Sequence, residues 1–155
     1  MSERSVTHST FTIERTYPAT PQRVFSAFWD PAKKRRWFAE GEKAEVEEFH
    51  MDFRIGGHEH TSFRFQENLL CRNDGSYMDI VPDRRVVIAY TMSIGDTRIS
   101  SSQMTVELLP VAARTLLIFT EQGAYFENSD GPDIRKDGWS QLLDQLGMEL
   151  TRQLI

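Results

Sequence analysis

The stretch 130–155 constrains the fold more than any other part of the sequence, because it has the pattern of one long amphipathic helix. Apolar side chains recur there at steps of three and four residues, the spacing that puts them on one helix face. They are Trp139, Leu142, Leu143, Leu146, Leu150 and Leu154. A helix with one apolar face is stable only when another element covers that face. The upstream chain must supply this cover.

The start of this helix is also signalled. Asp130 or Ser129 can accept hydrogen bonds from the first free amides, and Pro132 fits the first turn, where a missing N–H costs nothing. Gly138 and Gly147 each cost about 0.8–1 kcal/mol relative to alanine inside a helix. We interpret this cost as a sign that backbone or a ligand approaches the helix closely at both glycines.

Seven upstream segments are typical of strands, and the short turns between them favour antiparallel pairing. The expected strands span residues 10–17, 46–55, 58–65, 76–81, 86–92, 99–109 and 115–122. The expected turns between them include Gly56-Gly57, Asn73-Asp74-Gly75, Pro82-Asp83 and Gly95-Asp96. Glycine, asparagine and aspartate suit such turns because they tolerate a positive φ. The cover is therefore predicted to be an antiparallel sheet.

Two short helices are expected between the first two strands. Thr20 and Pro21 have the pattern of a helix start, and Asp30-Pro31 interrupts this helix and begins another that runs to Phe38. The element order predicts an α+β fold in which a curved antiparallel sheet wraps around the long C-terminal helix. We expect one domain over residues 1–155, with residues 1–9 as a flexible tail.

Composition excludes several kinds of partner. The formal net charge of -5 repels phosphate backbones, so no nucleic acid is expected, and the one basic run, 33–36, is interpreted as a solvated helix face. No apolar run is long enough to cross a bilayer, so no membrane partner is expected. The polar N-terminus lacks a secretory pattern, and the single Cys71 cannot form an internal disulfide. We therefore expect a cytoplasmic protein.

A sheet that closes on a helix from one side leaves a cavity between them. Strand and helix periodicity assigns the cavity lining to Phe25, Trp37, Phe38, Glu59, Phe63, Tyr77, Tyr90, Met104, Trp139, Leu143 and Leu146. In this lining Glu59 and Tyr90 are the expected polar anchors. The predicted ligand is a small hydrophobic or aromatic molecule, and no cofactor is expected.

Glu59 and Glu121 are the candidate catalytic residues. Glu59 shares its strand face with aromatic residues expected to turn inward, which would put a carboxylate in an apolar cavity; a slip of register at the preceding glycines would instead expose it. Glu121 lies near the end of the last strand, and with Tyr77 or Asp79 nearby it would allow acid–base chemistry.

A metal site is not expected, although His58 and His60 flank Glu59. Side chains alternate along a strand, so the two imidazoles lie on one face and the carboxylate on the other, and the three cannot bind one ion together. Cys71 has no neighbouring histidine or helix start that would activate its thiol, so we interpret it as unreactive.

Five motifs occur in order along the chain. They are Ser-Ala-Phe-Trp-Asp-Pro (26–31) followed by Arg-Arg-Trp-Phe (35–38), Asp-Phe-Arg-Ile-Gly-Gly (52–57), Tyr-Met-Asp-Ile-Val-Pro-Asp-Arg-Arg-Val-Val (77–87), Thr-Glu-Gln-Gly (120–123) and Asp-Gly-Trp (137–139). Together they resemble bacterial homologues of the heat-shock-protein-90 ATPase activator domain, within the START-like (SRPBCC) helix-grip superfamily. The resemblance covers about residues 10–154 and implies a helix-grip fold with a hydrophobic ligand cavity.

The resemblance does not imply one activity, because the superfamily includes lipid carriers, hormone receptors, cyclases and chaperone activators. Three alternatives follow: binding of a small ligand, a cyclase- or hydrolase-type enzyme that uses Glu59 or Glu121 as a general base, and an interaction module for a chaperone ATPase. The outward face with Val87, Ala89 and Thr91 also leaves a homodimer open.

Overall fold

The computed structural model describes residues 4–40, 44–65 and 68–152. Its seven strands form one antiparallel sheet in the order β1-β7-β6-β5-β4-β3-β2. Their bounds are β1 (Thr7–Tyr17), β2 (Glu45–Met51), β3 (His58–Arg64), β4 (Leu70–Val81), β5 (Arg85–Ile94), β6 (Thr97–Val111) and β7 (Arg114–Tyr125). Neighbours from β2 to β7 follow one another in the chain, whereas β1 joins the sheet at the far side of β7.

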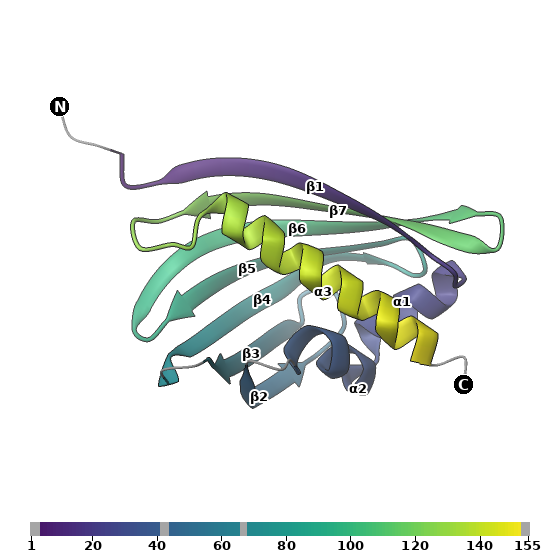
Figure 1. Cartoon of the computed structure of the whole chain (residues 1–155), viewed down its shortest axis with the longest axis horizontal. Helices are drawn as coiled ribbons and strands as arrows, with labels where there is room; N and C mark the ends of the chain where they lie inside the picture. Colours follow the sequence, from purple (N-terminus) through teal and green to yellow (C-terminus); the bar gives the residue numbers. More distant parts are fainter. Residues whose placement is uncertain (1–3, 41–43, 66–67, 153–155) are drawn as a thin grey trace.

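The helices lie on one side of this sheet. Helix α1 (Pro21–Trp29), helix α2 (Pro31–Lys34) and a π-helical turn, η1 (Arg35–Ala39), connect β1 to β2, and α3 (Pro132–Arg152) follows β7. Figure 1 shows α3 crossing one face of the curved sheet obliquely, with α1 and α2 near its C-terminal end. The predicted α+β helix-grip fold, with two short helices after the first strand, is confirmed. No helix within the described ranges is long and apolar enough to span a bilayer.

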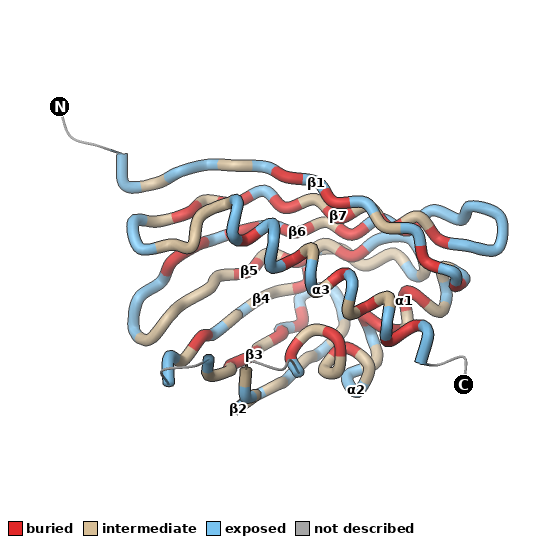
Figure 2. The backbone as a smooth tube through the Cα atoms, viewed as in Figure 1, coloured by how far each residue is buried: buried red, intermediate tan, exposed pale blue. Residues whose placement is uncertain are grey.

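The core lies between the sheet and α3. Along β7 buried positions alternate with more exposed ones, as expected for a strand with one covered face (Figure 2). Helix α3 buries Trp139, Leu143, Leu146 and Leu150 of the predicted stripe. Leu142 is only partly buried, and Leu154 lies outside the described residues. Four residues of the apolar stripe therefore face the sheet, and Leu142 lies at the side of the helix.

Tyr17 anchors the middle of α3 to the first strand. Its hydroxyl donates a hydrogen bond of 2.7 Å to the carbonyl oxygen of Leu143. A Cβ at Gly147 would lie 3.2 Å from the Tyr17 ring, so glycine leaves room for the ring to approach the helix. A close approach does occur at Gly147, but a side chain makes it, whereas the sequence suggested backbone or a ligand.

Local capping explains where the short helices begin. The Thr20 hydroxyl accepts from the amide of Arg23 at 3.3 Å, and the Asp30 carboxylate accepts from the amide of Ala32 at 3.0 Å. Within η1, Trp37 is buried, and its indole N–H donates to the Ala27 carbonyl at 2.8 Å. This bond fixes η1 against α1, at the side of the sheet where β2 and β3 lie.

Two strand ends differ from the expected ones. β1 begins at Thr7, so residues 7–9, which were expected in the tail, belong to the sheet. The strand predicted for residues 46–55 ends at Met51. The amide of Gly57 bonds to the Arg54 carbonyl at 2.8 Å, and Gly56 has a φ of +86°, so the turn occupies more residues than the two glycines alone.

The turn predicted at Asn73-Asp74-Gly75 is wrong. These residues lie inside β4, which begins at Leu70. Gly75 pairs with Glu59 on one side and with Tyr90 on the other. Pairing with two strands satisfies the backbone on both sides, and this tertiary context overrides the turn preference of the three residues.

Candidate functional site

A cleft of about 800 Å³ opens between α3, η1 and the adjoining part of the sheet. Its aromatic walls include Trp37 and Phe38 from η1 and Trp139 from α3. The sheet contributes Phe63, Asn73, Tyr90 and Met92, and Phe65 follows the end of β3. Gly138 also lines the cleft, and a Cβ there would meet no atom within 4 Å. The helix therefore presents open space at this glycine, where the sequence suggested a close approach.

A much smaller pocket, of about 20 Å³, adjoins the cleft. Phe38, Asn73, Tyr90 and Trp139 line both, so we call the small one the inner pocket. Its remaining walls are Glu59, Gly75, Ile88 and Met104. A Cβ at Gly75 would lie 3.0 Å from the Ile88 side chain, so any larger residue would press on the wall of the inner pocket.

Some of the predicted lining residues border a pocket, and the others lie in the packed core. Trp37 and Phe63 line the cleft, Glu59 and Met104 line the inner pocket, and Phe38, Tyr90 and Trp139 line both. The remaining predicted residues, Phe25, Tyr77, Leu143 and Leu146, lie in the packed core and line neither pocket.

Close packing removes these four from the cleft. Leu143 and Leu146 are fully buried on the face of α3 that packs on the sheet. The ring of Phe53 lies between Phe25 and Tyr77, with centroids 5.6 Å and 4.9 Å away respectively. Periodicity identifies inward-facing residues, but only the packed structure separates those that fill the core from those that border the cleft.

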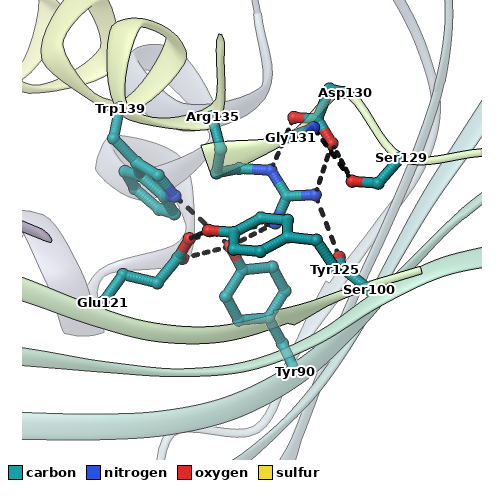
Figure 3. A network of polar contacts seen from close by, with 9 residues as sticks. All are labelled: Tyr90, Ser100, Glu121, Tyr125, Ser129, Asp130, Gly131, Arg135 and Trp139. Carbon is teal, nitrogen blue, oxygen red and sulfur yellow. Dashed lines mark hydrogen bonds and ion pairs between the residues drawn. The ribbon is translucent and has the colours of Figure 1, made fainter. Parts of the chain in front are cut away.

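Glu121 is fully buried in a network of polar contacts between the sheet and the first turn of α3 (Figure 3). The hydroxyl of Tyr90 donates to one of its carboxylate oxygens, and the hydroxyl of Tyr125 donates to the other at 3.1 Å. Tyr90 also accepts, from the Arg135 guanidinium at 3.2 Å and from the Trp139 indole at 3.3 Å. The hydroxyl of Tyr90 is thus engaged by three partners.

Arg135 holds this network to the start of α3. Its guanidinium makes two hydrogen bonds of 2.9 Å to the Asp130 carboxylate and one of 2.9 Å to the Ser100 hydroxyl. Asp130 was one of two expected helix caps, but its carboxylate binds Arg135, and the hydroxyl of Ser129 accepts from the Gly131 amide at 3.1 Å. Sequence reasoning missed Arg135. The available signal was a cation in the first helical turn, which the helix dipole disfavours unless a specific partner is present.

Burial and hydrogen bonding act in opposite directions on the two carboxylates of this network. Burial raises the pKa of Glu121, although the bonds from Tyr90 and Tyr125 and the charge of Arg135 oppose it. Burial also acts to raise the pKa of Asp130, but the bonds and charge of Arg135 outweigh it and lower that pKa. Asp130 is thus the anion that pairs with Arg135, and Glu121 retains a proton more readily than an ordinary glutamate.

Gly123 allows Tyr125 to reach Glu121. These three residues alternate along β7 and share one face of the sheet. A Cβ at position 123 would lie 2.7 Å from the Tyr125 ring, which is closer than side chains pack. The ring of Tyr125 therefore occupies the space that a larger residue at position 123 would need.

Glu59 is paired, whereas the sequence suggested a carboxylate in apolar surroundings. One of its oxygens accepts both from the Lys34 ammonium and from the Tyr77 hydroxyl, each at 2.9 Å. Lys34 is only 1% exposed and lies 4.8 Å from the centroid of the Phe38 ring. The interpretation of residues 33–36 as a solvated face is therefore wrong for Lys34, because the chain turns this side chain inward to neutralise Glu59.

The predicted grouping of Tyr77 or Asp79 with Glu121 is also wrong. Tyr77 bonds to Glu59, and Asp79 pairs with Arg85 at 2.8 Å on the outer part of the sheet. The two candidate catalytic glutamates thus have separate sets of partners.

Another ion pair joins the two walls of the cleft. Arg36 of η1 binds Glu149 of α3, with 3.2 Å between its Nε and Oε2. Glu149 is only 3% exposed, and both residues line the cleft. The lining therefore contains charges, and its two buried ones, Arg135 and Glu149, are paired with Asp130 and Arg36.

Other reactive groups lie apart from the cleft. Among the residues that the structure describes, no three histidine, cysteine or acidic side chains gather in a way that could hold a metal ion. His58 contacts Ser76 at 3.2 Å, and His60 contacts Asp74. Burial raises the pKa of Cys71 to about 12, so its thiol stays protonated at neutral pH.

Comparison with known proteins identifies the family. Residues 18–151 match the profile of the family described as "Activator of Hsp90 ATPase homolog 1-like protein". This chain belongs to that family. Among curated proteins, none matches the chain. Membership in the Activator of Hsp90 ATPase homolog 1-like family agrees with the helix-grip architecture and with the resemblance seen in the sequence.

Solved structures of similar proteins support the same assignment. The Mll3558 protein from Rhizobium loti is 47% identical, with 94% of this chain and 99% of that chain covered and a TM-score of 0.87. A putative uncharacterized protein from Rhizobium leguminosarum is 37% identical, with 97% and 99% covered and a TM-score of 0.92. CalU16 from Micromonospora echinospora, at 23% identity, 98% and 87% coverage and a TM-score of 0.62, shares the fold.

Proposed function

We propose that this member of the family binds a small hydrophobic or aromatic molecule in the cleft between α3, η1 and the sheet. The observation that carries this proposal is the cleft itself, whose volume of about 800 Å³ and aromatic walls resemble those of small-molecule sites. The ring of Trp139 packs 4.5 Å from Phe119 and 5.8 Å from Phe38, so the aromatic wall is supported from behind. A wall that is already packed in place favours binding, because its side chains lose little conformational freedom when the ligand enters.

The charges around the cleft also favour an uncharged ligand. Arg135 is neutralised by Asp130, Arg36 by Glu149, and Glu59 by Lys34. A charged ligand that bound to one of these six residues would have to break its pair, and leaving a buried charge without its partner is costly. An apolar molecule can occupy the cleft while all three pairs stay intact.

The cleft can be narrowed at Gly138 to test this proposal. Because a side chain there would grow into open space, Gly138→Leu should lower the affinity for 2-naphthol at least tenfold while the protein stays folded. Affinity is measured by titration of the amide signals in ¹⁵N NMR spectra. The matched control is Gly138→Ala, which adds one carbon and should change affinity little. Equal affinity in wild type and Gly138→Leu would place the ligand elsewhere and contradict the proposal.

A second candidate is acid–base catalysis in the same space. The observation that favours it is Tyr90, which lines both pockets and donates to Glu121, whose pKa is raised by burial. Native mass spectrometry of protein from its host, followed by release of the bound compound, would supply the substrate to test. Turnover that is lost in Glu121→Gln while binding survives would support catalysis, and unchanged turnover would exclude Glu121. The same pair of measurements on Glu59→Gln tests the other candidate.

The partners of the protein and its cellular location are further proposals. The family name refers to activation of a chaperone ATPase, so stimulation of such an ATPase by this protein remains an alternative role. It is tested by the ATPase rate with and without the protein, using Gly138→Leu to separate a surface effect from a cleft effect. A homodimer and a cytoplasmic location stay predictions, to be checked by light scattering and by fractionation of host cells.

A further inference from the structure

We infer that the ligand carries a hydroxyl group, which enters the inner pocket between Asn73 and Glu59 while the apolar body of the ligand occupies the cleft. Both residues line the inner pocket, and Asn73 lines the cleft as well, so its amide lies where the two spaces meet. This inference rests on the proposed function, because it concerns the class of molecule that the same cleft would hold.

The size of the inner pocket limits what can enter it. A space of roughly 10–15 Å³ is enough for one water molecule, and the inner pocket has about 20 Å³. A single hydroxyl group fits this space, whereas an aromatic ring must remain in the cleft. Phe38 and Trp139 line both spaces and would flank the carbon atoms next to the hydroxyl.

Asn73 offers a polar atom that the protein itself does not use. Its side-chain oxygen is buried and meets no hydrogen-bond donor within the described part of the chain. Thr61, its direct partner across the β3–β4 pair, also has a buried hydroxyl without a partner there. Buried polar atoms are nearly always satisfied in folded proteins, so unsatisfied atoms beside a cleft point to a bonding group on a ligand.

The other polar groups of the inner pocket are engaged. The Tyr90 hydroxyl contacts Glu121, Arg135 and Trp139, and the contact with Trp139 uses its indole N–H. The two hydrogen bonds to Glu59 both end on the same carboxylate oxygen, Oε1. The unpartnered oxygen of Asn73 is therefore the acceptor with which the inner pocket would recognise a ligand, and the Glu59 carboxylate lies in the same pocket.

The inner pocket selects a hydroxyl over other polar groups of similar size. The side-chain oxygen of an amide can only accept a hydrogen bond, so the ligand must donate one to pair with Asn73. An ether or a ketone has no donor, and a ligand carboxylate would be repelled by Glu59. A ligand ammonium would face Lys34, whose nitrogen lies 2.9 Å from the same carboxylate. A hydroxyl donates one hydrogen bond, which the unpartnered side-chain oxygen of Asn73 can accept.

Two probes of the same shape test the inference. 2-Naphthol and 2-methylnaphthalene differ by a hydroxyl in place of a methyl group, and ¹⁵N NMR titration of the wild-type protein gives both affinities. We expect 2-naphthol to bind up to about tenfold more tightly, as a buried hydrogen bond to the Asn73 oxygen predicts. It should also shift the side-chain amide signal of Asn73, which 2-methylnaphthalene should leave nearly unchanged.

Variants locate the source of this preference. Asn73→Leu should bring the two affinities within about twofold of each other, because it replaces the amide with an apolar group of similar size. The matched control is Met92→Leu, which lies opposite Asn73 and lines only the cleft, so it should alter both affinities equally. If Asn73→Leu does not fold, the comparison of the two probes on the wild-type protein still tests the inference.

The outcomes separate this inference from the proposed function. Equal affinities in the wild-type protein, or a preference that survives in Asn73→Leu, overturn the assignment of a hydroxyl and leave binding in the cleft intact. Failure of both probes to bind contradicts the cleft proposal as well. A preference that disappears in Asn73→Leu and persists in Met92→Leu supports both.

Discussion

Glu121 shows at the scale of one residue how the sheet and α3 jointly define a buried group. Its donors come from β5 and β7, and Arg135 reaches the same network from α3. A buried carboxylate without donors would lose several kcal/mol of solvation, so these contacts decide whether it is tolerated. The same contacts fix Tyr90 at the border of both pockets, so the polar network positions part of the ligand site.

The raised pKa of Glu121 predicts a pH effect on stability. The folded protein binds this proton more tightly than the unfolded chain, whose glutamate has an ordinary pKa of 4.5. The stability from this group is fully present below pH 4.5 and is lost as the pH rises through the folded pKa. The free energy of unfolding of wild type relative to Glu121→Gln should therefore fall as the pH rises above 4.5. Denaturant unfolding at a series of pH values measures it, and a flat difference would contradict the assigned direction.

Tyr125→Phe should destabilise the protein by about 1–3 kcal/mol, because it leaves one oxygen of a buried carboxylate without its donor. Gly123→Ala should have a cost of the same kind, since the added carbon pushes the Tyr125 ring away from Glu121. If both act on one hydrogen bond, the double variant should cost less than the sum of the two. Additive losses in denaturant unfolding would show that they act separately.

Sequence reasoning found some residues of the site and missed their partners for a physical reason. Glu59 was identified because alternation turns it inward, and Glu121 because it lies near the end of the last expected strand. Arg135 and Lys34, which neutralise the two networks, come from helices, and their contacts depend on how those helices pack on the sheet. Asn73 was assigned to a turn because its local sequence favours one, although its strand pairs on both sides.

At the scale of elements, two faces of α3 have different roles. One face packs on the sheet through Leu143 and Leu146, and the adjoining side borders the cleft through Gly138 and Leu142. The two glycines of this helix serve different neighbours. Gly147 accommodates the Tyr17 ring, while Gly138 faces open space.

This difference predicts unequal effects of the same substitution. Gly138→Ala should stabilise the protein by about 0.8–1 kcal/mol, the intrinsic gain of alanine over glycine in a helix. Gly147→Ala should gain less or lose stability, because its Cβ would lie 3.2 Å from the Tyr17 ring, whose hydroxyl is fixed to Leu143. Thermal and denaturant unfolding of both variants make the comparison. Equal gains would mean that the Tyr17 ring does not restrict position 147.

The elements themselves were largely predictable. Alternation and turn residues located seven strands, and the apolar stripe located α3. Boundaries were less predictable where two strands satisfy a segment that prefers a turn, as at Asn73-Asp74-Gly75. The cleft depends on packing distances between elements, which periodicity does not contain.

At the scale of the whole molecule, ion pairs connect the parts that surround the cleft. Lys34 at the end of α2 binds Glu59 of β3, and Arg36 of η1 binds Glu149 of α3. These two ion pairs therefore connect the segment from α2 to η1 both to strand β3 and to helix α3. Its position should determine how wide the cleft is.

Lys34→Met should destabilise the protein by about 3–5 kcal/mol, because it leaves the Glu59 carboxylate buried beside Phe38 without its cation. Glu59→Gln in the same chain should restore much of the loss, since no charge then remains unpaired. Denaturant unfolding of the two single variants and the double variant gives the coupling energy. A double variant that is as unstable as the sum of both changes would contradict the pairing.

The position of β1 at the side of β7 has a consequence for how the chain is made. The hydroxyls of Thr12 and Thr120, 108 positions apart, bond across this pair, and β1 has no other neighbour in the sheet. During synthesis the first strand must therefore wait until β7 has left the ribosome before it can pair. Nascent chains halted before residue 114 should leave β1 open to protease, and chains released after α3 should protect it.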